Sequence, residues 1–303
     1  MKNIVGYIKG FIYEVDKTML ALVTLLAAIL IYINYRYQID QFISDHHSFW
    51  YSWVARYLIF LVAFTIPYLL FKTLRHKRYT QRLFIVMLLI APAIFSLKAA
   101  LSITMPFSNN LDWNKYWNYV FYWPVNFIIT SSILVLIWKS TKTVHSFYGI
   151  TKSDINWRPY FIMLLIMFPL VAVASLQPDF LAMYPKLKLL GSGAAYGQFG
   201  WWHKLLFELS YGSDFLTIEL FFRGFLILGF IKWVGKDAIL PMACFYCTIH
   251  FGKPLGECIS SYFGGMILGI VVYNTRSILG GLMVHLGIAW MMEVGGYIGN
   301  VYK

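Results

Sequence analysis

Nine apolar runs, each close to the length that crosses a lipid bilayer, dominate this sequence of 303 residues. A membrane-spanning helix needs about 20 mostly apolar residues. The seventh and eighth runs are the shortest and are separated by Lys253-Pro254-Leu255-Gly256, so eight spans is the alternative count. The runs are residues 18–35, 49–71, 83–101, 117–138, 159–176, 203–230, 237–252, 257–273 and 278–299. We therefore predict an all-α polytopic transmembrane helical bundle of about eight to nine spans.

The composition leaves too little polar surface for a water-soluble globule. Hydrophobic residues make up 59% of the chain and charged residues only 13%, and the mean hydropathy is +0.64. The formal net charge of +12 could suggest nucleic acid, but the basic residues cluster between the apolar runs, where they would meet anionic lipid headgroups. We expect the lipid bilayer, and no nucleic acid, as a partner.

Two basic clusters follow the second and fourth runs and indicate how the chain is oriented. They consist of Lys72, Arg75, Lys77, Arg78 and Arg82, and of Lys139, Lys142, Lys152 and Arg158. If the helices alternate, both clusters lie on one side, which is cytoplasmic by the positive-inside rule. We expect an integral protein of a bacterial inner (cytoplasmic) membrane with a cytoplasmic N-terminus. Arg56 and Lys98 lie close enough to run ends to reach the headgroups.

Ionisable residues within the rear apolar runs point to a functional site. At such depth they cost several kcal/mol each unless they face a protein interior or a water-filled cavity. Glu219 and Arg223 lie at positions i and i+4 of one run, where they share a helix face and can pair. His250 and His285 lie in two later runs, near glycines that permit close helix contact. We expect polar groups from three helices to converge.

The order of these residues resembles the CAAX protease and bacteriocin-processing (CPBP, or ABI) family of intramembrane glutamic endopeptidases. That family is marked by Glu-Glu-x-x-x-Arg, then Phe-x-x-x-His, then His-x-x-x-Asn or Asp, on successive membrane helices. Here the three motifs align with Ile218 to Arg223, with Tyr246 to His250 and with His285 to Ala289. The surrounding Phe-Phe-Arg-Gly-Phe-Leu at 221–226 and Gly-Gly-x-x-x-Gly at 264–269 also fit the pattern.

The resemblance covers roughly residues 150–300 and implies a function for that half of the chain. It implies a metal-independent endopeptidase whose substrate is a peptide or protein at the membrane, with no cofactor. We divide the chain into N-terminal transmembrane scaffold helices at 1–150 and a CPBP-like protease core at 151–303. Nothing in the sequence selects a prenylated substrate.

Two positions depart from the family pattern. In the family the first Glu of the pair is thought to activate water with the first His, while the second His and the Asn stabilise the oxyanion. This chain has Ile218 and Ala289 at two of these four positions. A catalytically inactive relative that binds a membrane peptide, a lipid or a partner protein is therefore the alternative function.

For hydrolysis we assign Glu219 and His250 to polarising water, His285 to the oxyanion and Arg223 to orienting Glu219. Structural interpretations stay open for each of them. Glu219 and Arg223 could be only a buried pair between helices. His250 could cap a helix end or lie at the lipid headgroups, and His285 could make an interhelical hydrogen bond.

Two further carboxylates are possible substitutes for the missing base. Asp214 lies about one turn before Ile218, a rise of roughly 5.4 Å. Glu257 follows Pro254 and could face the same cavity. Their structural alternatives are a cavity-facing polar role for Asp214 and a helix N-terminal role for Glu257.

The cysteines do not indicate a metal centre or a disulfide framework. All three lie between positions 244 and 258 in apolar surroundings, so we expect them to be reduced. Cys244, Cys247 and His250 are spaced i, i+3 and i+6, which spreads them by about 120° around a helix. No second pair of Cys or His lies nearby, and no metal is expected.

Overall fold

The computed structural model describes residues 2–46, 48–77, 79–141, 146–151, 155–191 and 199–302. Throughout these residues the regular secondary structure is helical and contains no strand. Among the described residues, six helices are long and apolar enough to cross a membrane. They are α2 (Lys17–Tyr37), α4 (Phe49–Leu74), α5 (Arg82–Ala100), α6 (Leu111–Thr141), α12 (Leu255–Thr275) and α13 (Leu279–Val301). The predicted all-α transmembrane fold is confirmed, with six of the nine runs meeting this criterion.

Two of the remaining runs form helices of a different kind. α7 (Arg158–Ala174) is apolar but has only 17 residues. The run at 203–230 is α9 (Trp201–Glu219) followed without a break by the π-helix η3 (Leu220–Gly229). A π-helix is uncommon and is frequently found at functional sites. Here it begins directly after Glu219.

The run at 237–252 contributes only α11 (Ile239–Thr248), for a local reason. Gly252 has a φ of +81°, in the left-handed region that favours glycine, and Pro254 then stands at the start of α12. His250 consequently lies in the turn between α11 and α12 and not within a helix.

Two central segments are buried along their whole length. Every residue of η3 and of α11 is buried. α11 packs against α2, α4 and α12, whereas η3 packs against α9, α11 and α12. Aromatic rings join the front and rear halves, since the ring of Phe95 on α5 lies 5.0 Å from that of Phe221 and 4.9 Å from that of Phe222. The front helices therefore pack directly on the segment that carries the motifs.

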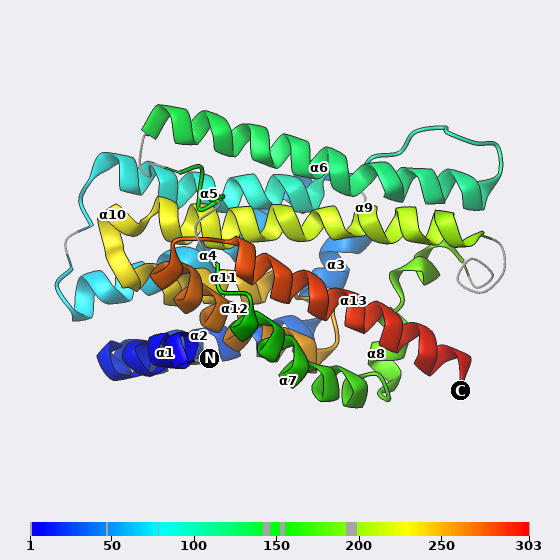
Figure 1. Ribbon diagram of the computed structural model, residues 1–303. Helices are drawn as coiled ribbons and strands as arrows, with labels where there is room; N and C mark the ends of the chain where they lie inside the picture. The colour runs from blue at the N-terminus through cyan, green and yellow to red at the C-terminus, as the bar shows by residue number, and fades with distance from the viewer. Residues whose placement is uncertain are drawn as a thin grey trace.

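The outer helices complete the bundle around this centre (Figure 1). α6 packs on α9 along one edge, α7 packs on α13, and α1 (Lys2–Glu14) packs on α12. The short elements are α3 (Ile39–Asp45), α8 (Pro178–Met183), η1 (Lys186–Leu190), α10 (Ile231–Val234) and η4 (Gly235–Ala238).

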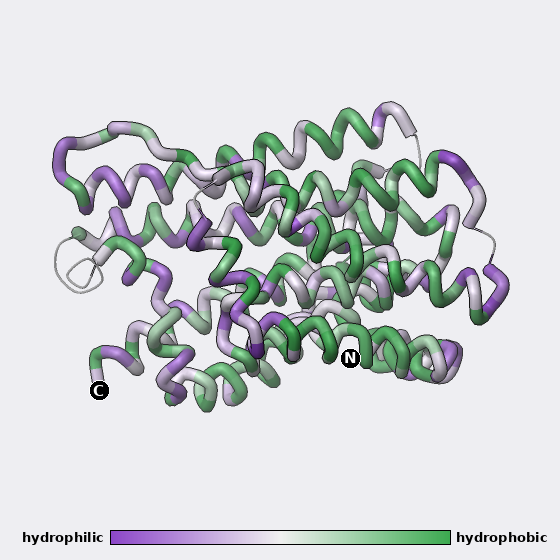
Figure 2. The backbone as a smooth tube through the Cα atoms, turned by 180° about the vertical axis from the view of Figure 1, so that it is seen from behind, coloured by the Kyte–Doolittle hydropathy of each residue, from purple (hydrophilic) through white to green (hydrophobic). Residues whose placement is uncertain are grey.

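The polar segments gather mainly in the loops at the two ends of the bundle, and the helices between them are mainly hydrophobic (Figure 2). The α4–α5 turn and the C-terminal end of α6, where the two predicted basic clusters begin, lie at the same end of the bundle (Figure 1). Arg78, Lys142 and Lys152 of these clusters lie outside the described residues. The assignment of this end to the cytoplasm stays a prediction.

Candidate functional site

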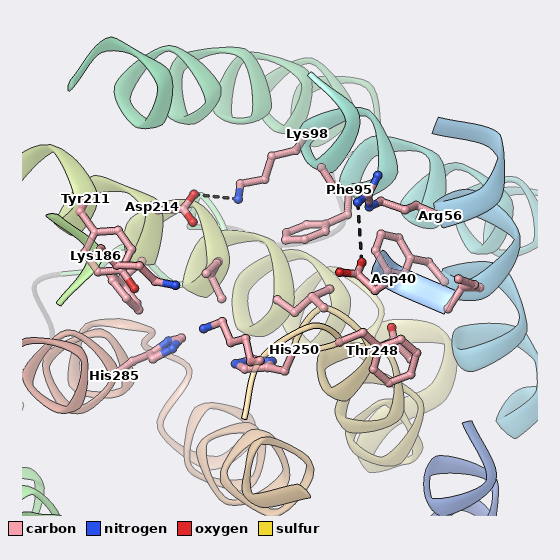
Figure 3. A pocket seen from close by; sticks show the side chains of 18 residues that line it. Asp40, Arg56, Phe95, Lys98, Lys186, Tyr211, Asp214, Thr248, His250 and His285 are labelled. Atoms are coloured by element: carbon pink, nitrogen blue, oxygen red, sulfur yellow. Dashed lines mark ion pairs between the residues drawn. The ribbon is translucent and has the colours of Figure 1, made fainter. Parts of the chain in front are cut away.

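A cavity of about 220 Å³ lies between the front and rear helices. Its wall combines side chains from α3, α4, α5, η1, α9, the α11–α12 turn and α13. Figure 3 shows the polar groups that surround it. The ionisable lining residues are Asp40, Arg56, Lys98, Lys186, Asp214, His250, Lys253 and His285. Two of the predicted site residues, His250 and His285, therefore share one cavity.

Glu219 and Arg223 form an ion pair just behind this cavity. Both side chains are 0% exposed, and the guanidinium Nη1 lies 3.1 Å from the carboxylate Oε1. Neither residue belongs to the cavity wall. The missing side chain of Gly281 makes room for the carboxylate, because a Cβ there would lie 3.1 Å from Glu219 Oε2. The pair thus supports the site from inside the protein.

His285 connects the buried carboxylate to the cavity. Its Nδ1–H donates to Glu219 Oε1 over 2.8 Å, and its Nε2 lies 3.0 Å from the hydroxyl of Tyr246. The side chain of His285 is 13% exposed. The interhelical hydrogen bond considered from the sequence is present, and it is made to two partners. Both ring nitrogens are held, which fixes the orientation of the imidazole.

The second cavity histidine, His250, is held through its Nδ1 and not, like His285, through both ring nitrogens. Its Nδ1 lies 3.0 Å from the carbonyl oxygen of Tyr246, and because a carbonyl can only accept, Nδ1 carries the proton. In the neutral ring Nε2 then has a free lone pair. His250 is 8% exposed and lines the cavity. Its Nε2 is therefore available as a hydrogen-bond acceptor.

Asp214 is the one predicted carboxylate that lines the cavity. Its Oδ1 lies 2.7 Å from the ammonium of Lys98, and the two side chains are 15% and 10% exposed. A second pair on the wall joins Arg56 to Asp40 over 3.6 Å (Figure 3). The sequence predicted that Lys98 and Arg56 extend to the headgroups. Instead they turn inward, because a partly buried carboxylate faces each of them.

Glu257 has a separate set of partners. Its Oε1 lies 2.7 Å from the ammonium of Lys253, and the hydroxyl of Tyr184 donates to both carboxylate oxygens over 3.0 and 2.9 Å. Glu257 does not line the cavity, whereas Lys253 does. Its contacts tie the start of α12 to the segment before η1 and fit the structural alternative.

The two departures from the family pattern occupy apolar positions. Ile218 is on the cavity wall, so the expected first carboxylate is replaced there by an alkyl group. Ala289 is 6% exposed and packs within an aromatic cluster that includes Phe207, Tyr211 and Phe215. Neither position supplies a polar group.

Three of the site groups that were not predicted from the sequence bear on its chemistry. Lys98 comes from the presumed scaffold, and Lys186 comes from the loop before α9. Burial lowers the pKa of Lys186 to about 8, and the nearby ammonium of Lys253 acts in the same direction. The third group is the hydroxyl of Tyr246. The sequence did contain a signal for it, because Tyr246 stands where the family pattern has Phe.

The cysteines lie apart from this hydrogen-bond chain. All three are buried and free, and the sulfurs of Cys247 and Cys258 are 3.9 Å apart. Within the described ranges, no three His, Cys, Asp or Glu side chains form a group that could hold a metal ion.

Comparison with known proteins places the motif-bearing segment in a family. Residues 199–291 match the family model described as Rce1-like, "Type II CAAX prenyl endopeptidase Rce1-like". No curated protein and no solved structure matches the chain. The matched segment contains the ion pair, both cavity histidines and the α11–α12 turn. The match covers residues 199–291 and not the rest of the chain, and over this segment the predicted resemblance to the CPBP family is confirmed.

Proposed function

We propose that this protein is an integral membrane endopeptidase that hydrolyses a peptide bond of a membrane-embedded or membrane-associated peptide or protein. The observation that carries the proposal is that His250 and His285, from different parts of the chain, line one cavity, with His285 bonded to a buried carboxylate. The Rce1-like match of the same segment supports a protease-type fold.

The hydrogen bonds suggest how the two histidines divide the work. His250 takes a proton from water through Nε2, and the water oxygen bonds to the substrate carbonyl carbon. When the C–N bond breaks, His250 returns that proton to the leaving nitrogen. His285, held at Nδ1 by Glu219, takes a proton from solvent at Nε2 before the reaction, and the positive charge of its ring then stabilises the negative charge that develops on the carbonyl oxygen.

The geometry favours an indirect role for Glu219. We expected it to polarise water together with His250, but it is fully buried and its Oε1 contacts His285 and Arg223. Asp214 is the carboxylate available on the cavity wall, where its Oδ1 lies 2.7 Å from the ammonium of Lys98. We therefore propose that Glu219 acts through His285, whereas Asp214 can orient the attacking water.

The alternative is a catalytically inactive relative that binds a membrane peptide, lipid or partner protein. The observation that favours it is that Ile218, at the position of the family's first Glu, puts an alkyl group on the cavity wall. The second departure, Ala289, lies in an aromatic cluster. A binding protein would need the cavity but not the proton-accepting nitrogen of His250.

Cleavage assays in proteoliposomes distinguish the two functions. The substrates are fluorogenic peptides in matched pairs with and without a C-terminal prenyl group, and a chelator is included in a parallel series. For a peptidase, His250→Ala and His285→Ala abolish cleavage while the exposed His46→Ala variant cleaves at the wild-type rate. Cleavage that survives both cavity substitutions would overturn the proposal. Peptide binding without cleavage in the wild type would favour the inactive relative.

The chelator series tests the metal-independent chemistry separately. Water activation by His250 needs no metal ion, so we expect the rate to be the same with and without chelator. A rate that falls with chelator and returns with added zinc would contradict the metal-independent mechanism, although the protein would still be a peptidase.

A further inference from the structure

The hydroxyl of Tyr246 lies where the family pattern provides no polar atom. The second motif of the family begins with Phe, and this chain has Tyr246 there. The added oxygen lies 3.0 Å from His285 Nε2, and Tyr246 is only 4% exposed. A phenylalanine would leave that nitrogen without this partner. The difference therefore changes the surroundings of a cavity histidine.

We propose that Tyr246 is a positioning residue of the hydrolytic site, which holds His285 in one orientation through both of its protonation states. The assignment rests on the proposed peptidase function. Glu219, His285 and Tyr246 form a continuous hydrogen-bond chain from α9 through α13 to α11.

A phenol suits this task because it can both donate and accept. In the neutral imidazole, Nδ1–H donates to Glu219 and the hydroxyl of Tyr246 donates to Nε2. When Nε2 gains a proton, its N–H donates to the phenolic oxygen, and the hydroxyl proton turns away. The imidazole of His285 can thus change its charge without losing a partner or moving.

The surroundings of Tyr246 keep its hydroxyl in place. The guanidinium carbon of Arg223 lies 4.1 Å from the centre of the ring, which is within the range of a cation–π contact. The ring of Phe222 contacts it edge-on at 5.1 Å. On α12, Gly265 leaves the space that the ring of Tyr246 needs, since a Cβ there would lie 2.7 Å from this ring. The same arginine therefore stabilises both Glu219 and Tyr246.

Tyr246 also supports the other cavity histidine. Its carbonyl oxygen accepts the hydrogen bond from His250 Nδ1, and the two rings are 4.8 Å apart. Because this bond comes from the main chain, a change of side chain preserves it. The two roles of Tyr246 can therefore be separated by removing the hydroxyl alone.

The test is Tyr246→Phe, which keeps the ring, its contact with Arg223 and the main-chain bond to His250. Tyr262→Phe is the matched control, because Tyr262 is buried and its hydroxyl bonds to Thr24 over 3.0 Å, away from the histidines. For Tyr246→Phe we expect kcat to fall about tenfold with little change in KM, since one hydrogen bond of about 1.4 kcal/mol corresponds to this factor. The pH profile of kcat should also shift, whereas the control should match the wild type.

A second measurement does not depend on catalysis. In protein with ¹⁵N-labelled histidine, assigned with His285→Ala, the Nε2 signal of His285 should be that of a hydrogen-bonded nitrogen and should move in Tyr246→Phe but not in Tyr262→Phe. If the wild type cleaves no peptide, the proposed function fails while the nitrogen signals still report this bond. If Tyr246→Phe has the same kcat, pH profile and nitrogen signals as the wild type, the proposed role of Tyr246 is wrong.

Discussion

The Glu219–Arg223 ion pair makes a strong prediction about stability. Glu219→Gln keeps the size of the side chain and a carbonyl oxygen that can accept from His285 Nδ1–H. It removes the negative charge beside a guanidinium that is 0% exposed. Removing one partner of a buried pair leaves an uncompensated charge and costs about 3–5 kcal/mol. We expect a loss of this size in the free energy of unfolding.

Reversible unfolding in mixed detergent micelles, followed by circular dichroism, measures this loss. The double variant Glu219→Gln/Arg223→Met removes the stranded charge and should recover most of the stability, because apolar replacement of a buried pair is often neutral. Glu14→Gln, in the exposed pair with Lys236, is the control and should leave the unfolding curve unchanged. A cost below about 1 kcal/mol for Glu219→Gln, or no recovery in the double variant, would refute the reasoning.

Three further predictions concern the surroundings of the cavity. Gly265→Ala adds a methyl group 2.7 Å from the ring of Tyr246 and should lower both stability and cleavage. Gly264→Ala, whose methyl group would meet nothing within 4 Å, is the control and should change neither. Equal effects of the two substitutions would contradict this packing. Asp214→Asn leaves Lys98 without its carboxylate and should lower the unfolding free energy by about 1–3 kcal/mol in the same micelles, and an unchanged curve would argue against a buried pair. Burial lowers the pKa of Lys186 from 10.5 to about 8, so the folded state releases this proton at a lower pH than the unfolded state does, and the free energy of unfolding should rise between pH 8 and 10.5. Melting curves of Lys186→Met should show a smaller rise. A wild type whose stability does not rise over this range would contradict the burial of the ammonium.

Apolar length predicted the positions of the helices well. The predicted run at 83–101 is Arg82–Ala100 in the structure, and the run at 278–299 is Leu279–Val301. Such runs need only enough apolar residues to cross the bilayer, and this property can be counted along the sequence. The π-helix η3 was not predicted, because a π-helical turn differs from an α-helical one in hydrogen bonding and not in composition.

The sequence predicted several residues of the candidate site but not how they are arranged. The motifs identified His250 and His285, and both line the cavity. They did not reveal that Glu219 lies behind the cavity wall, because a helical run that is buried on all sides gives no periodic signal for its inner face. The inward turn of Lys98 depends on Asp214, which is far away in the sequence and becomes its neighbour only after α5 packs against η3 and α9.

The front helices supply one side of the cavity, through Asp40, Arg56 and Lys98. A fragment restricted to residues 199–291 would keep the histidines and the ion pair but would open that side to lipid. Selection of what enters the cavity can therefore evolve by substitution in α3, α4 and α5, while the histidines on the opposite wall stay as they are. Proteins that share the matched segment can in this way bind different molecules, through changes in front helices that the family pattern does not describe.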